Sequence, residues 1–388
     1  MANSLPIWKV YCLMAALVVV GAVGACIAKL QGLQRVDSGD RWEHPWFQAF
    51  AMFVGEILCL FYYFIEKYLD KRKYGPRGLH PRIHEARRQG LKTRINLFMF
   101  AIPASCDAVA TAMIYFAYLN IPLSVAEMMQ GALVLMTTCA SVIFLGKKFF
   151  LYQWGSLVFI VGGICLVGAS SIKNDKGTDG NPVLGVCLML GALLIQSAQL
   201  IVEEKLFRTY YLSPLKVVGF QGLFGICIYL VFLPIAYFIK CGGDLCPAGR
   251  LEDSLMALRG LKENYILLIL VIALMIDISV FNTLGNSVTK YASCANRATI
   301  NTVKVVLVWI FFLIYWGEGQ EHFHWLQFGG FILIVIGTFT FNYMKDKQLT
   351  QQEEESAASY RPLVAEVNKS DNIISPSTTS DRERFVSI

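Results

Sequence analysis

The chain has 388 residues, of which 55% are hydrophobic and only 16% are charged, and its formal net charge is +6. Soluble globular domains carry about 25% charged residues, so this composition excludes an ordinary soluble domain and predicts a membrane protein. Ten apolar stretches are each long enough to cross a hydrocarbon core of about 30 Å as a helix. Because no strand-like alternation competes, we expect an all-α bundle. The ten expected spans are 8–30, 46–68, 96–118, 122–145, 151–171, 183–203, 214–239, 264–287, 297–316 and 325–344.

The basic connections predict the orientation of these spans. Residues 71–94 contain nine Lys or Arg and one acid, which is typical of a cytosolic loop. The other connections expected on that side are also basic, at Lys147, Lys148, Lys205, Arg208 and Lys290. We therefore expect both termini in the cytosol, with the first span retained as a signal-anchor. Nucleic-acid binding is not expected of residues 71–94, because that loop is tethered between two spans.

The long connection at residues 240–264 is expected on the opposite, lumenal side. Cys241 and Cys246 lie in it, and they either form a disulfide or remain free thiols, the disulfide requiring an oxidising compartment. Residues 251–261 could form an interfacial helix. Most of the remaining cysteines lie within spans, where this residue usually acts as a small hydrophobe.

An internal repeat divides the chain into two units of five spans. Residues 153–163 and 327–337 share five identical positions of eleven, including Gly155 with Gly329 and Gly163 with Gly337. An odd number of spans in each unit reverses the direction of the second, so we expect inverted repeats, which are typical of secondary transporters. The expected units are 1–172 and 173–345, followed by a polar, disordered cytosolic tail, 346–388.

Polar residues interrupt the apolar spans at several positions. An ionised group in mid-membrane costs about 2.5–3.5 kcal/mol and normally faces the bundle interior or an aqueous cavity. We therefore predict that the deep polar residues line a cavity that binds the solute. The predicted solute-binding residues are Lys304, Asn301, Gln130, Glu127, Asp107 and Asp277.

Spacing places two pairs of these residues on shared helix faces. Glu127 lies three residues before Gln130, and Asn301 lies three residues before Lys304. Two interpretations of Lys304 remain open: a fixed cation that meets an anionic group of the solute, or a structural ion pair with Asp277, Asp107 or Glu127.

The other deep acids also have alternative interpretations. Asp107 follows Pro103 and either lines a pathway beside a proline kink or bonds a neighbouring hydroxyl. Glu56 is the candidate for proton coupling, although it could remain protonated as a structural hydrogen-bond donor. Glu203 and Glu204 are expected to form a solvated rim, with a gate as the alternative.

The tail contains one short motif. Tyr360 and Leu363 fit the Tyr-x-x-apolar pattern of a cytosolic sorting signal, which would bind a sorting adaptor. None of the common catalytic or nucleotide-binding motifs is present, so we expect no enzyme, cofactor or metal centre. The two lumenal histidines, His322 and His324, are only a weak hint of metal binding or pH sensing.

Several longer segments resemble one transporter group. They are HPWFQAFAMFVGE (44–56), CDAVATAMIYFAYL (106–119), MMQGALVLMTTCASVIFLGKKF (128–149), VEEKL (202–206), QGLFG (221–225), FNTLGNSVTK (281–290) and NRATINTVKVVLVW (296–309). With them the chain resembles the drug/metabolite transporter superfamily, and within it the nucleotide-sugar-transporter-like solute carrier family 35, subfamily F. The resemblance implies an endomembrane carrier, often lysosomal, that works by alternating access, with a homodimer as one expected assembly.

Two functions from different classes follow. The first is a secondary-active carrier of a small polar organic solute, proton-coupled or working by exchange, within membrane lipids. The second is a non-transporting membrane adaptor or receptor that acts through loop 71–94 and the tail. Deletion of residues 346–388 would abolish the second function and only misplace a carrier.

Overall fold

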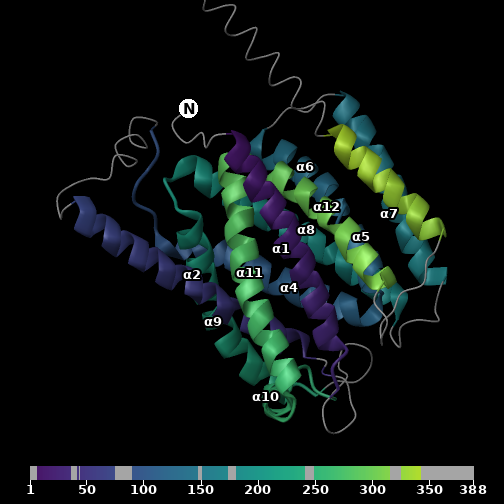
Figure 1. Cartoon of the computed structure of the whole chain (residues 1–388), viewed down its shortest axis with the longest axis horizontal. Coiled ribbons are helices and arrows are strands. Elements are labelled where there is room, and N and C mark those ends of the chain that lie inside the picture. Colours follow the sequence, from purple (N-terminus) through teal and green to yellow (C-terminus); the bar gives the residue numbers. More distant parts are fainter. Residues whose placement is uncertain are drawn as a thin grey trace, which may run out of the picture. The chain divides into compact units, whose positions relative to one another are not determined.

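The computed structural model describes residues 7–35, 42, 44–74, 90–146, 151–173, 181–240, 249–314 and 325–341. Every regular element in this described part is helical, as expected (Figure 1). The two Cys241 and Cys246 thiols, His322 and His324, and the tail with Tyr360 and Leu363 lie outside it. The chain falls into two compact units, 1–338 and 339–388.

Seven helices in the described residues are long and apolar enough to cross a membrane. They are α1 (Ile7–Gly32), α2 (Pro45–Tyr74), η1 with α4 (Leu97–Phe100 and Ala101–Asn120), α5 with α6 (Leu123–Met129 and Ala132–Leu145), α8 (Pro182–Thr209), α9 (Pro214–Phe238) and α11 (Tyr265–Tyr291). This confirms a multi-pass, all-α membrane protein.

The remaining three expected spans are also helical. They are α7 (Leu151–Lys173), α12 (Cys294–Ile314) and a helix at Trp325–Phe341. The apolar parts of α7 and of the last helix are shorter than those of the seven above, and α12 carries two basic residues. Their crossing of the membrane stays a prediction.

Asparagine and proline residues mark where several helices begin. The Asn181 side chain accepts hydrogen bonds from the backbone amides of Val183 and Leu184, and Pro182 occupies the first turn of α8. Asn264 caps α11 in the same way. These residues satisfy or remove amides that have no partner within the helix, so the connections end where the sequence supplies a cap.

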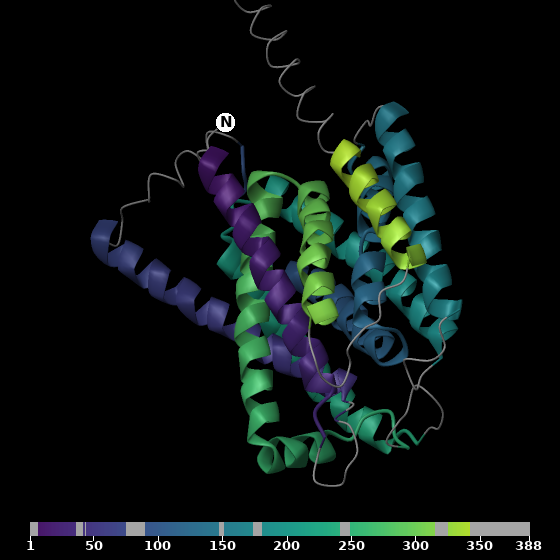
Figure 2. The ribbon, with the colours of Figure 1, turned by 45° about the vertical axis from the view of Figure 1, so that its right-hand side comes forward.

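The strongest helix contacts cross the boundary between the two predicted five-helix units. α4 packs along α8, α2 along α9, and α1 along α11, and Figures 1 and 2 show α1 and α11 side by side. Further contacts join α2 with α11, α4 with α9, α6 with α8, and α1 with α12. Helices of the first and second units therefore alternate around a common interior.

Glycines bring α7 and residues 325–338 into backbone contact. A Cβ atom on Gly330 would come within 2.8 Å of the carbonyl oxygen of Gly163, and one on Gly337 within 2.7 Å of that of Ser156. Only residues without a side chain permit such an approach. Gly163, Gly330 and Gly337 therefore permit close packing of these two helices.

The predicted helix in the 240–264 connection is observed as α10 (Ser254–Glu263). Its Ala257 and Leu261 pack against a cluster that includes Trp42, Phe47 and Leu267. Just before α10, Glu252 accepts a bond from the backbone amide of Phe47, in the first turn of α2, at 3.2 Å. The other oxygen of Glu252 lies 2.6 Å from His44 Nδ1.

Candidate functional site

Lys304 forms a buried ion pair with Glu127. Its Nζ lies 3.1 Å from Glu127 Oε2, and the exposed fractions of the two side chains are 9% and 0%. Lys304 comes from α12 and Glu127 from α5, so one contact joins the two predicted five-helix units. Of the three acids proposed as structural partners, Glu127 is therefore the one that the ammonium group contacts.

Two neutral donors also hold Glu127. Tyr118 donates from its hydroxyl to Glu127 Oε1 at 2.7 Å, and Gln130 donates from Nε2 to the same oxygen at 2.9 Å. The helix is interrupted at Gln130 and Gly131, where Gly131 N bonds Met128 O, three residues back. Such a tightened turn inside a span often marks a functional hinge.

The other predicted residues divide between this ion pair and a second cluster. Asp277 interacts electrostatically with Lys304. Asn301 is buried one turn before Lys304 on α12, and its Oδ1 has no hydrogen-bond partner among the described residues. Asp107 is elsewhere, within electrostatic range of Glu56, Glu203 and Arg297.

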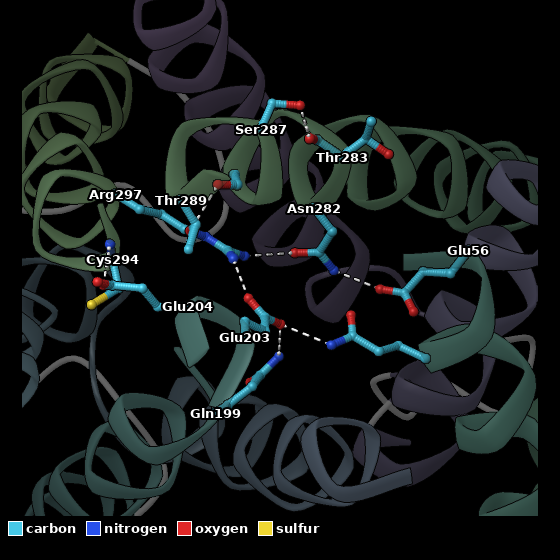
Figure 3. A network of polar contacts seen from close by, with 12 residues as sticks. Glu56, Gln199, Glu203, Glu204, Asn282, Thr283, Ser287, Thr289, Cys294 and Arg297 are labelled. Atoms are coloured by element: carbon cyan, nitrogen blue, oxygen red, sulfur yellow. Dashed lines mark hydrogen bonds and ion pairs between the residues drawn. The ribbon is translucent and has the colours of Figure 1, made fainter. Parts of the chain in front are cut away.

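The second cluster centres on Arg297 and Glu203 (Figure 3). Arg297 Nη1 lies 2.7 Å from Glu203 Oε2, and both side chains are buried. Glu203 Oε1 accepts from Gln221 at 2.9 Å and from Gln199 at 3.2 Å. This glutamate is thus fully engaged by residues of α8, α9 and α12.

Asn282 connects this cluster to Glu56. Its Nδ2 donates to Glu56 Oε1 at 2.6 Å, and its Oδ1 accepts from Arg297 Nη2 at 3.4 Å (Figure 3). Glu56 is buried, and its Oε2 has no hydrogen-bond partner in the described part of the chain.

Two expectations about neighbouring residues are corrected. Glu203 and Glu204 do not form a solvated rim, because only 0% and 2% of their surfaces are exposed; α8 continues to Thr209 and carries them into the bundle. Asp107 accepts from the Thr111 hydroxyl at 3.2 Å, as the structural alternative predicted. Pro103 lies in the first turn of α4, directly after the 3-10 turn η1, so it marks that junction rather than a kink within α4.

A family model described as nucleotide-sugar transporter matches residues 9–236, which is more than half of the chain. The chain belongs to the nucleotide-sugar transporter family. It is therefore a solute transporter and not an enzyme.

Relatives of this transporter match over most of their length. Solute carrier family 35 member F6 of Homo sapiens is 31% identical over 307 residues, covering 78% of each chain. An uncharacterised protein of Schizosaccharomyces pombe is 27% identical, covering 76% of this chain and 86% of its own. The UDP-N-acetylglucosamine transporter of Rattus norvegicus is 21% identical, covering 79% of this chain and 87% of its own.

The transporter contains site residues that the sequence analysis did not select. Arg297 lies four residues before Asn301 and seven before Lys304, so all three share one face of α12. That spacing could have identified Arg297 as a site residue. It was not selected because it is the first residue of the expected span 297–316, where a charge is usually solvated. Tyr118 had no such signal, because its contact with Glu127 depends on how α4 meets α5.

Proposed function

We propose that this transporter is a secondary-active carrier that moves a small polar organic solute across an endomembrane by alternating access. The observation that carries the proposal is the buried Lys304–Glu127 pair between α12 and α5. A buried pair is a weak source of stability, because desolvation offsets most of its Coulomb attraction. Its presence in a transporter is better accounted for by a site where charged groups of a solute exchange with those of the protein.

The helix contacts support two inverted repeats. In two repeats, helices at the same position of each five-helix unit are equivalent. This rule relates α1 to α8, α2 to α9, α4 to α11 and α6 to α12. Under this exchange the α1–α11 contact corresponds to α8–α4, α2–α11 to α9–α4, and α1–α12 to α8–α6. Each member of these pairs is observed, as two-fold related halves around a central site require.

The orientation is supported by the position of the basic connections. Lys92 exchanges backbone hydrogen bonds with Thr209 and Tyr211, and the Lys290 ammonium donates to the carbonyl of Leu212 at 2.8 Å. Three connections expected to be cytosolic therefore meet at one end of the bundle. We propose that this end faces the cytosol, together with both termini.

Charge near the ion pair favours a solute with a cationic group. Glu127 and Asp277 both lie near Lys304, so acids outnumber the base. A solute that carries an amine beside an anionic group could pair with Asp277 and Lys304 while Glu127 keeps its bonds from Tyr118 and Gln130. The name of the UDP-N-acetylglucosamine transporter indicates the competing class, an anionic nucleotide sugar.

The remaining parts of the proposal rest on the sequence and on one deep acid. Glu56 is the proposed proton-coupling residue, because a buried carboxyl with one unpartnered oxygen is a suitable place for a proton. A lysosomal or other endomembrane location and a homodimer are proposed from the family resemblance, and a sorting adaptor from the Tyr360 and Leu363 motif of the tail.

The test is uptake by proteoliposomes that contain the purified full-length protein. A defined mixture of amino acids, organic cations, organic acids and nucleotide sugars is offered, and the retained compounds are identified by mass spectrometry with and without a pH gradient. Lys304→Ala and Glu127→Gln should each lower uptake of the retained compound by about tenfold or more. The matched control is Lys216→Ala, since Lys216 lies 6.0 Å from the Phe220 ring much as Lys304 lies 5.5 Å from Phe281.

Uptake that is equal in Lys304→Ala, Glu127→Gln and the wild type would reject the proposed site. Retention of no compound above empty liposomes would reject the carrier proposal for these classes.

A further inference from the structure

Asn282 lies between two charged groups that the proposed function does not connect. It is the hydrogen-bonded link from Glu56 on α2, in the first five-helix unit, to Arg297 on α12, in the second (Figure 3). Arg297 shares its helix face with Lys304. A change of protonation at Glu56 could therefore reach the proposed solute site through Asn282 and α12.

The hydrogen-bonding chemistry of these groups fixes the direction of the Asn282 amide. An arginine side chain can only donate, so it must face the carbonyl oxygen Oδ1. The amide Nδ2 then faces Glu56 and can only donate, which requires that Glu56 Oε1 accept. The observed arrangement therefore has Oε1 as an acceptor and leaves Oε2, which has no hydrogen-bond partner among the described residues, as the oxygen that would take a proton.

The surroundings of Glu56 favour uptake of a proton. Its charged neighbours are Asp107 on α4, Glu203 on α8 and Arg297 on α12, two acids against one base. α9 adds the uncharged Gly222, against the Glu56 Cβ, and α11 adds Asn282. The thiol of Cys59 lies one turn further along α2. Burial beside two other acids and only one base disfavours a charged carboxylate at Glu56.

A proton on Glu56 would change what this residue requires from Asn282. The proton comes from the aqueous phase and forms an O–H bond at Oε2, where no acceptor lies among the described residues. Because a buried donor without an acceptor is costly, we expect the carboxyl to turn and present this O–H to Asn282. Asn282 then turns its Oδ1 toward Glu56 to accept, and the N–H···O bond from Nδ2 to Glu56 is lost. Its Nδ2 then faces the donor-only guanidinium of Arg297, and that contact breaks.

We propose that Asn282 is a positioning residue that transmits protonation of Glu56 to Arg297, and thereby to the helix that carries Lys304. The inference rests on the proposed function, because it explains how proton uptake would reach the solute site. Arg297 keeps its ion pair with Glu203 in both states. Protonation of Glu56 therefore removes only the hydrogen bond between Arg297 and Asn282 of α11, and Arg297 retains its counter-charge.

Two buried cysteines can report the two ends of this link. Cys59 lies on α2 with its Sγ 3.3 Å from the hydroxyl of Thr283, the neighbour of Asn282. Cys294 lies on α12, three residues before Arg297. Their rates of alkylation by N-ethylmaleimide are measured in the full-length protein in proteoliposomes by peptide mass spectrometry. Each rate is divided by that of the same thiol in SDS-denatured protein at the same pH.

In the wild type, both normalised rates should change by about fivefold or more between mildly alkaline and mildly acidic pH, the size expected of a coupled pair of sites. Glu56→Gln should abolish both responses. Asn282→Leu should leave the response of Cys59 and abolish that of Cys294, whereas Asn282→Gln, which keeps a donor and an acceptor, should restore part of it. If Asn282→Leu does not fold, Asn282→Ala serves instead, because it also removes both the donor and the acceptor of the link.

Asn286→Leu is the matched control, since Asn286 is a buried asparagine one turn further along α11; both responses should persist. The proposal is overturned if Cys294 responds normally in Asn282→Leu, or if that variant loses both responses together. A wild type that responds at neither thiol also overturns it. That result leaves the carrier proposal to be judged by the uptake experiment with Lys304→Ala and Glu127→Gln.

Discussion

Replacing Lys304 by methionine tests the energetic role of the ion pair. The change keeps most of the side-chain length and removes the charge, which leaves Glu127 buried without its counter-charge. Removing one partner of a buried pair costs about 3–5 kcal/mol. Because Tyr118 and Gln130 still donate to Glu127, we expect the lower end of this range, about 3 kcal/mol.

The partner variant distinguishes a specific pair from a general loss of packing. Glu127→Gln alone should cost about 2 kcal/mol, since Asp277 remains near Lys304. The double variant should cost about 2 kcal/mol as well, because both charges of the pair are removed and only Asp277 loses a nearby cation. The resulting coupling energy is about 3 kcal/mol, at the upper end for contacting residues.

The measurement is unfolding of the purified protein in detergent, followed by tryptophan fluorescence at one protein concentration. Lys216→Met, at a half-buried lysine of α9, is the matched control and should change stability by less than about 1 kcal/mol. Additive losses in the double variant would show that Lys304 and Glu127 do not interact, and would refute the reasoning.

Four further predictions follow from single contacts. Gly330→Leu should destabilise the protein by about 1–3 kcal/mol in the same unfolding assay, since the new side chain meets the Gly163 backbone. Gly329→Leu, with nothing within 4 Å of its Cβ position, should leave the stability unchanged. Tyr118→Phe should cost about 1.5–3 kcal/mol, the value of a hydrogen bond to a charged group, and an unchanged midpoint would contradict the contact with Glu127. Glu252→Ala should uncap α2 and speed amide hydrogen exchange at Phe47; an exchange rate equal to that of the wild type would argue against that cap. Deletion of residues 346–388 should leave liposome uptake intact and alter only the location in cells, whereas lost uptake would favour the adaptor function.

The helices and their order could be predicted from hydropathy because a lipid environment leaves few alternatives. Each expected range is helical where the structure describes it. The interruption at Gln130 and Gly131 was not predicted, since a run of apolar residues does not reveal a local change from α to 3-10 bonding. That detail depends on neighbouring helices, such as the one whose Ile334 packs on Gly131.

The composition of the site was less accessible to prediction than the fold. Spacing along one helix placed Asn301 with Lys304, but three acids were equivalent partners until the helices were placed against each other. Glu203 was misjudged because it is followed by Glu204 and Lys205, a pattern that usually indicates a solvated helix end. Burial of such a residue depends on the arginine that α12 brings to it, and a single helix carries no information about that meeting.

Arg297 and Lys304 lie seven residues apart, so about 10.5 Å of one continuous helix separates their backbones. Spinning α12 about its long axis would pull both cations from their glutamates together and would add the two separation energies. Tilting the helix about Asn301, between them, would instead open one pair while pressing the other closer. A tilt about Asn301 would therefore separate one ion pair at a time, whereas a rotation about the helix axis would separate both at once.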